Sequence, residues 1–166
     1  MHGHSEPERA AITGAIVAGG RGERFGGRPK GLETVAGVKI LDRVAGALRE
    51  VVPKVVLICN QPDANRWLSG VPVYHDERSE RGSLVGLHTA IRHAPGPVLV
   101  VAWDMPFVTP ELFALIVGEL GPEVNAVVPE GPRGLYHISS VGSSARVTMT
   151  RAMQSSTNMW QRTTTM

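Results

Sequence analysis

The sequence predicts an α/β domain built around a single, doubly wound and mostly parallel β-sheet. Apolar runs of strand length alternate with longer segments of helical period, and this alternation is typical of βαβ units. Several of the runs are almost continuously apolar, as expected for strands buried on both faces. Polar or glycine-rich residues follow these runs directly, and a chain of 166 residues is long enough for one domain with a sizeable core.

The first half of the chain contains most of the expected elements. Residues 40–52 carry apolar side chains at spacings of three and four, which predicts an amphipathic helix, and Pro53 ends it. A turn is expected at Ala36-Gly37 within a short extended piece, and residues 62–68 predict one or two helical turns. The expected strands of the whole chain are residues 12–18, 54–59, 71–76, 97–103 and 125–131.

Two further helices are predicted after the third strand. Ser83 is the expected N-cap of the helix at residues 82–94. The apolar residues that share one face of this helix are Leu84, Leu87, Ile91 and Ala94. Thr109 is the expected N-cap of the last helix, with Pro110 in its first turn.

Composition divides the chain into three parts. Residues 1–10 are polar and are expected to be flexible, and residues 11–134 form the expected folded domain. Residues 135–166 form an atypical tail rich in serine and threonine, without a helical or strand period and without any acidic residue. Such a composition favours disorder or docking on another surface.

The overall charge and the single cysteine exclude several classes of function. The net charge of +2 comes without a basic run, and aromatic residues make up 5% of the chain, so we expect no nucleic acid partner. No apolar run approaches the ~20 residues of a membrane span, so no membrane partner is expected. Cys59, inside an apolar run, is expected to be a buried small hydrophobe in a reduced, cytoplasmic protein.

A glycine-rich, cationic loop follows the first expected strand. Glycines allow a backbone to approach an anion closely, and arginine and lysine add charge where a phosphate would bind. The loop lacks the Walker A pattern, and Phe25 stands where the third glycine of G-x-G-x-x-G would be. It therefore indicates phosphate binding without naming a class, and a solvated surface turn is the alternative.

Polar residues at the ends of three later strands complete the candidate site. Asn60, Asp76 and Asp104 each follow an apolar run, and ligands of such folds bind at the carboxyl ends of the strands. Asp104 is the best metal candidate, because a carboxylate at the end of a buried strand is costly unless it is paired or binds a cation such as Mg²⁺. Local turn hydrogen bonds are the alternative for Asp104. Asn60 and Asp76 could bind a base or ribose, or initiate turns.

Together these features resemble the molybdenum cofactor guanylyltransferases, a family of small nucleotidyltransferases with a Rossmann-like fold. The family loop is L-A-G-G-x-x-x-R-x-G-G-x-D-K, and here Val17-Ala18-Gly19-Gly20, Arg24, Gly26-Gly27 and Lys30 stand at the same spacing. The resemblance continues through Asn60, through "HDERSERGSLVGL" and through "WDMPFVTPEL". It covers roughly residues 12–130.

The resemblance implies a substrate, a cofactor and a role for each candidate residue. GMP would be transferred from GTP to molybdopterin, which gives the guanine dinucleotide form and releases pyrophosphate. By similarity, Asn60 and Asp76 would bind the nucleoside, and Asp104 the magnesium and the nucleotide. The implied catalytic residues are Arg24, Lys30 and Asp104. Val17, Ala18, Gly19, Gly20 and Lys30 would hold the rest of the nucleotide.

Two departures from the family pattern bear on activity. Pro29 stands where the family has aspartate before the lysine, and no N-x-N-T-type loop is found in the C-terminal part. We hypothesise that the tail from about Gly134 is truncated or read out of frame. The alternatives are therefore a CTP-using molybdopterin enzyme, a nucleotidyltransferase for another small acceptor, or a GTP-binding member with impaired catalysis. Transient contacts with other cofactor-biosynthesis proteins or molybdoenzymes are also expected.

Overall fold

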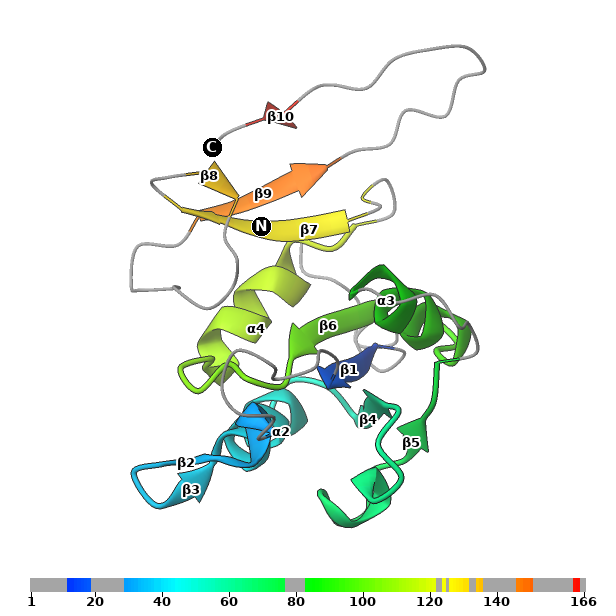
Figure 1. Ribbon diagram of the computed structural model, residues 1–166. Helices are drawn as coiled ribbons and strands as arrows, with labels where there is room; N and C mark the ends of the chain where they lie inside the picture. The colour runs from blue at the N-terminus through cyan, green and yellow to red at the C-terminus, as the bar shows by residue number, and fades with distance from the viewer. Residues whose placement is uncertain are drawn as a thin grey trace.

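The computed structural model describes residues 12–18, 29–76, 83–121, 124, 126–131, 134–135, 146–150 and 163–164. Its centre is a parallel sheet of four strands in the order β5-β4-β1-β6. These strands are β1 (Thr13–Ala18), β4 (Lys54–Cys59), β5 (Val73–Tyr74) and β6 (Val98–Ala102). Figure 1 shows them side by side. The α/β class and the parallel core predicted from the sequence are confirmed.

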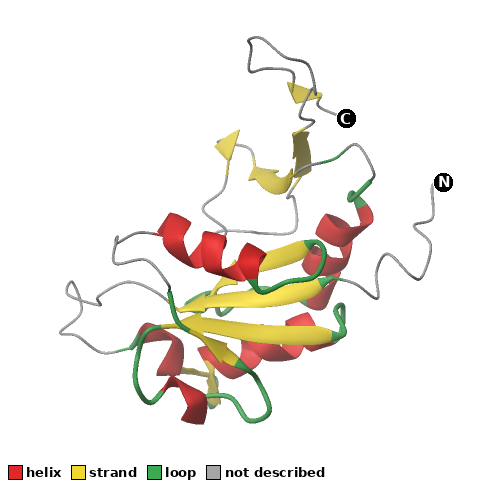
Figure 2. Cartoon of the chain, turned by 90° about the vertical axis from the view of Figure 1, so that its right-hand side faces the viewer, coloured by secondary structure: helices red, strands yellow, loops and turns green. Residues whose placement is uncertain are grey.

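Three helices cover the two faces of this sheet, as Figure 2 shows. They are α2 (Ile40–Arg49), α3 (Ser83–Arg92) and α4 (Pro110–Gly118). The larger core joins one sheet face to α2 and α4, with Ile16, Leu41, Leu48, Leu57 and Phe113 among its most buried side chains. The smaller core lies on the other face and contains Ala15, Val56, Ile58 and Ala90, the last of these from α3. The chain thus forms the layered arrangement typical of doubly wound folds.

The buried face of α3 differs from the face expected from its apolar pattern. Leu84 and Ile91 are 78% and 57% exposed, whereas Val85, Thr89 and Ala90 are buried. Gly86 explains the difference, because a Cβ placed there would lie 2.6 Å from Cγ1 of Val17 in β1. The helix therefore approaches the sheet through Gly86 and Ala90, and the large side chains of Leu84 and Ile91 are left exposed. Ser83 is the first helical residue rather than the N-cap.

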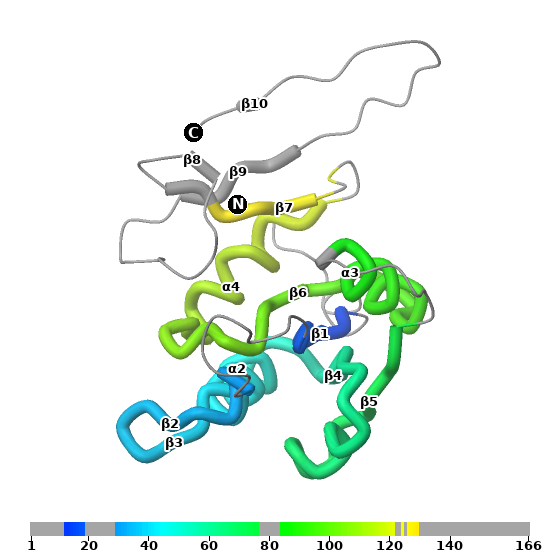
Figure 3. The backbone as a smooth tube through the Cα atoms, in the orientation of Figure 1, coloured from blue at the N-terminus to red at the C-terminus, as the bar shows by residue number. Residues whose placement is uncertain are grey.

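Short elements and a helix cap agree with the expected turn chemistry. A hairpin of β2 (Thr34–Val35) and β3 (Val38–Lys39) turns at Ala36 and Gly37, both with positive φ (49° and 78°), and it extends beyond α2 in Figure 3. Two 3₁₀ turns, η2 (Lys30–Leu32) and η3 (Ala64–Arg66), follow the glycine-rich loop and β4. The hydroxyl of Thr109 caps α4 by accepting from the Leu112 amide at 3.3 Å, with Pro110 in the first turn.

The last expected strand belongs to a second sheet, not to the parallel one. β7 (Ala126–Gly131) pairs antiparallel with β8 (Gly134–Leu135) and β9 (Arg146–Thr150), and β9 pairs with β10 (Thr163–Thr164). The expectation of a single sheet was therefore wrong for residues 126–131, because strand propensity does not specify a pairing partner. The predicted flexible segment, residues 1–10, lies outside the described residues.

Candidate functional site

The parallel register brings the predicted site residues to one edge of the sheet. Ala18 at the end of β1 is level with Cys59 at the end of β4, and Val17 is level with Ala102 at the end of β6. Asn60 therefore follows β4 at this edge, Asp76 follows β5, and Asp104 follows β6. The strand order fixes their sequence along the edge as Asp76, Asn60, the end of β1, then Asp104. Three strand spacings separate the two outer positions, which is about 14 Å.

Asn60 and Asp76 form a reciprocal pair at the β5 end of this edge. The amide Nδ2 of Asn60 donates to Oδ2 of Asp76 at 2.9 Å, and the backbone N–H of Asp76 donates to Oδ1 of Asn60 at 2.7 Å. These two bonds determine the orientation of the Asn60 amide, because its oxygen must face the N–H and its nitrogen the carboxylate. A second donor, the Thr89 hydroxyl in α3, lies 3.0 Å from Oδ1 of Asp76.

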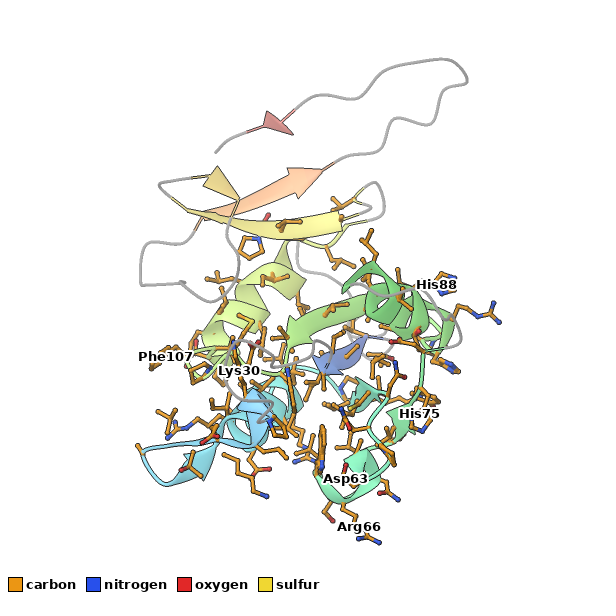
Figure 4. All side chains as sticks on the ribbon, in the orientation of Figure 1. Lys30, Asp63, Arg66, His75, His88 and Phe107 are labelled. Carbon is orange, nitrogen blue, oxygen red and sulfur yellow. The ribbon has the colours of Figure 1, made fainter. Side chains whose placement is uncertain are left out.

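A packed tryptophan connects the chain segments of Lys30 and Asp104 at the other end of this edge. Trp103, the residue before Asp104, is buried, and its ring packs so closely on Gly31 that a Cβ there would lie 2.4 Å from Cε3. The Trp103 ring also stacks on Trp67, with a centroid distance of 5.3 Å and an interplanar angle of 13°. Lys30 precedes Gly31, so the Gly31–Trp103 contact connects the lysine and aspartate segments. Figure 4 shows Lys30 well separated from His75, the neighbour of Asp76.

Asp104 is exposed, so the argument that burial makes a cation necessary does not hold. Its fit to a metal depends instead on chemistry: Mg²⁺ commonly takes one or two carboxylates and completes its shell with water and substrate phosphate oxygens. The exposed carboxylate of Asp104 at the end of β6 meets that requirement. Within the described part of the chain, no group of three or more His, Cys, Asp or Glu side chains could hold a metal by itself.

The glycine-rich loop is described only at its two ends. Val17 is half-buried and Ala18 is buried at the end of β1, whereas Gly19, Gly20 and Arg24 lie outside the described residues. Pro29, the departure from the family pattern, directly precedes η2, with φ −69°. Its carbonyl accepts from the Leu32 amide at 3.0 Å. Because φ −69° is the value that the proline ring imposes, proline fits the turn that precedes Lys30 without strain.

Cys59 is buried beneath this edge, as expected for a small hydrophobe. The Gln61 amide donates to its Sγ at 3.5 Å. Burial raises the pKa of the Cys59 thiol, and the nearby carboxylates of Asp63 and Asp76 raise it further, against the lowering effect of the Gln61 bond. The neutral thiol is therefore favoured, which suits a packing role.

Three residues of the site were not predicted from the sequence: Thr89, Gly31 and Trp103. The sequence offers little to identify Thr89 as a site residue. Threonine hydroxyls in helices commonly bond the carbonyl four residues earlier, so its position four residues after Val85 predicts only that local bond. The tryptophan contact had no sequence signal, because Gly31 and Trp103 are distant in the chain.

An α/β fold with polar groups gathered at the carboxyl edge of a parallel sheet is the arrangement in which doubly wound proteins bind ligands, nucleotides among them. Residues 14–162 match the family described as the MobA-like NTP transferase domain. The chain belongs to this family, which confirms the resemblance inferred from the loop and strand-end motifs.

Curated relatives carry names that agree with this assignment. A protein of Desulfosudis oleivorans named molybdenum cofactor guanylyltransferase is 33% identical over 135 residues, which cover 80% of this chain and 66% of the relative. A probable molybdenum cofactor guanylyltransferase of Pelotomaculum thermopropionicum is 37% identical over 132 residues, which cover 79% of this chain and 63% of the relative. The chain thus spans slightly less than two thirds of the length of either relative.

The fold is also shared with solved structures. The crystal structure of a protein from Aquifex aeolicus VF5 matches with a TM-score of 0.57 and 28% sequence identity, covering 72% of this chain and 63% of that one. No helix among the described residues is long and apolar enough to cross a membrane.

Proposed function

We propose that this protein transfers GMP from GTP to molybdopterin, forming molybdopterin guanine dinucleotide and releasing pyrophosphate. The observation that carries the proposal is the order of polar groups along the sheet edge. The Asn60–Asp76 pair stands at one end, Lys30 and Asp104 at the other, and the glycine-rich loop begins between them. The names of the relatives, which are guanylyltransferases, support the choice of substrates.

This order suits an extended nucleoside triphosphate. The nucleoside lies against Asn60 and Asp76, whose carboxylate and amide retain hydrogen-bonding capacity for a base or ribose. The phosphates run past the end of β1, where the backbone of Val17, Ala18, Gly19 and Gly20 is the proposed anion-binding segment. They end beside Lys30 and Asp104, with Arg24 as a further cation of the proposed catalytic set. Each of these assignments is a proposal for this chain.

The reaction needs no nucleophile from the protein. A terminal phosphate oxygen of molybdopterin attacks the α-phosphorus of GTP, and the bond from that phosphorus to the oxygen bridging to the β-phosphate breaks. Pyrophosphate leaves with the electron pair of that bond. The chain's own residues hold the two substrates in line and neutralise charge on the leaving group, with Lys30 as the proposed cation near the strand end that carries Asp104. A bound Mg²⁺, which Asp104 would hold, supplies further neutralisation of the phosphate charge.

Pyrophosphate release in the presence of molybdopterin, GTP and Mg²⁺ tests the proposal. Lys30→Ala and Asp104→Asn are each expected to lower kcat/KM by at least about a hundredfold. Lys54→Ala and Asp42→Asn are matched controls, because both side chains are exposed and lie outside the proposed site, Lys54 at the opposite edge of the sheet. Equal turnover in the site variants and the controls would contradict the site assignment.

Competition between nucleotides separates the alternatives. GTP is expected to bind more tightly than CTP and to displace it. Tighter binding of CTP would favour a CTP-using enzyme. GTP binding without pyrophosphate release would favour a member with impaired catalysis, consistent with the atypical tail at residues 135–166. The proposed setting is the cytoplasm, without nucleic acid or membrane partners and with transient contacts to other cofactor-biosynthesis proteins or molybdoenzymes.

A further inference from the structure

Thr89 is a buried polar residue of α3 whose hydroxyl contacts the Asp76 carboxylate of the candidate site. It lies in α3 and is only 1% exposed. Gly86 brings this helix against Val17 of β1, and Thr89 follows it by three residues, close to one helical turn. The close approach at Gly86 therefore positions the Thr89 hydroxyl against Asp76, 3.0 Å from its Oδ1.

The hydroxyl of Thr89 has one hydrogen and two acceptors within reach. Oδ1 of Asp76 and the carbonyl oxygen of Val85 each lie 3.0 Å from Oγ1. Bonding to a carbonyl four residues earlier is the ordinary position of a helical threonine. The carboxylate is the stronger acceptor, because hydrogen bonds to an ionised group are roughly twice as strong as neutral ones. The hydrogen is therefore expected to point toward Asp76.

With Thr89 in place, each oxygen of the Asp76 carboxylate has a protein donor. Asn60 occupies Oδ2 and Thr89 occupies Oδ1. Rotation of the carboxylate about its Cβ–Cγ bond would break both hydrogen bonds. Each oxygen still has a second lone pair with which to accept from a ligand. Asp76 is thus held in one orientation before any ligand arrives, and such preorganisation favours binding.

We propose that Thr89 is a positioning residue for the nucleoside, acting through Asp76: its buried hydroxyl holds the carboxylate in the orientation that accepts hydrogen bonds from the base or ribose. This inference rests on the proposed function, because it takes Asp76 as a nucleoside-binding residue. The proposal adds a second protein partner of the Asp76 carboxylate: Asn60 at the end of β4 bonds one oxygen, and Thr89 in α3 bonds the other.

Three variants separate positioning from a structural role. Thr89→Val keeps the branched shape and removes the hydroxyl, and Thr89→Ser keeps the hydroxyl. Thr13→Val is the matched control, because Thr13 is also 1% exposed but lies at the amino end of β1, about 16 Å from the carboxyl edge. Should Thr89→Val not fold, Thr89→Ala removes the same hydroxyl without adding an apolar group.

The readout is the dissociation constant of each variant for GTP and for inorganic triphosphate, both with Mg²⁺. Thr89→Val is expected to weaken GTP binding about tenfold and to leave triphosphate binding within twofold of the wild type. Thr89→Ser and Thr13→Val are expected to bind GTP within about threefold of the wild type. Because triphosphate has no nucleoside, only a loss at the nucleoside end changes the ratio of the two constants.

Two results would overturn the inference. One is an equal loss of GTP and triphosphate binding in Thr89→Val, which indicates a general structural role. The other is unchanged GTP binding in Thr89→Val while Asp76→Asn does weaken it. If the wild-type protein bound inorganic triphosphate as tightly as GTP, the proposed function itself would be overturned. This measurement is made before any Thr89 variant is tested, so the two failures are distinguishable.

Discussion

Gly31→Ala should have two effects with one cause: it should destabilise the protein, and it should displace Lys30. The added Cβ would lie 2.4 Å from Cε3 and 2.6 Å from Cδ2 of Trp103, whereas carbon atoms in contact prefer about 3.5–4.0 Å. An overlap of about 1 Å must therefore be relieved by movement of the ring or of the backbone. The ring is confined, because it is buried in the core and stacks on Trp67, which donates from Nε1 to Oδ2 of Asp63 at 3.1 Å.

The expected magnitude follows from two opposing contributions. Overpacking of this kind costs about 1–3 kcal/mol. Replacing glycine by alanine also restricts the unfolded chain, which returns about 0.4–1 kcal/mol, and positive φ occurs at Gly37 and Gly70 but not at Gly31. The net loss is about 1–2 kcal/mol, which lowers Tm by about 2–8 °C in a chain of this size. A shift of about 1 Å at Lys30 should lower kcat about a hundredfold.

Thermal unfolding and pyrophosphate release measure the two effects. Gly46→Ala in α2 is the matched control, because nothing lies within 4 Å of a Cβ at that position. Alanine there should stabilise the helix by about 0.5–1 kcal/mol. If Gly31→Ala raised Tm as the control does, the close contact with Trp103 would not exist as described. If Tm fell but kcat stayed at the wild-type value, the contact would not position Lys30.

Three other predictions concern single features of the fold. Thr109→Ala removes the N-cap of α4 and should lower the free energy of unfolding by about 1 kcal/mol in urea titrations, whereas Thr109→Ser should change it little. Ala36→Asn should raise that free energy by about 0.5–1 kcal/mol, because asparagine adopts positive φ more readily at the first position of a two-residue hairpin turn; a loss would contradict the turn assignment. Burial raises the pKa of the Cys59 thiol, so a higher pH is needed to form the thiolate in the folded protein than in the unfolded chain. At pH 8 the thiolate should therefore be scarce in the folded protein. Its reaction with a maleimide should be more than about tenfold slower than in urea, and equal rates would show that Cys59 is accessible.

The strands of the core could be predicted because burial on both faces leaves a clear mark. The runs that became β1, β4 and β6 are almost continuously apolar, and polar residues end them. Their parallel pairing then placed Asn60, Asp76 and Asp104 at one edge without further information. This part of the site depended only on strand order and on where each apolar run stops.

The helix α3 shows where the same reasoning fails. Its spacing of leucine and isoleucine suggested the buried face, but a helix that lies close to a sheet buries small side chains. Gly86 and Ala90 mark the face of α3 that packs on the sheet. A search for large apolar side chains overlooks both residues because they are small. Side-chain partners such as Thr89 with Asp76, or Gly31 with Trp103, depend on tertiary packing and had no counterpart in periodicity. The exposure of Asp104 likewise depends on the turn after β6.

The Trp67–Trp103 stack provides an intrinsic spectroscopic probe of the site. Two indole rings 5.3 Å apart and nearly parallel couple their electronic transitions, so they should produce a near-ultraviolet circular dichroism band that depends on their spacing. One of these rings directly precedes Asp104 in the chain and packs on the residue after Lys30. Any ligand that pulls on either segment should change this band or the tryptophan emission. Binding could therefore be followed in the unlabelled protein, with Trp103→Phe as the variant that removes the coupled circular dichroism band.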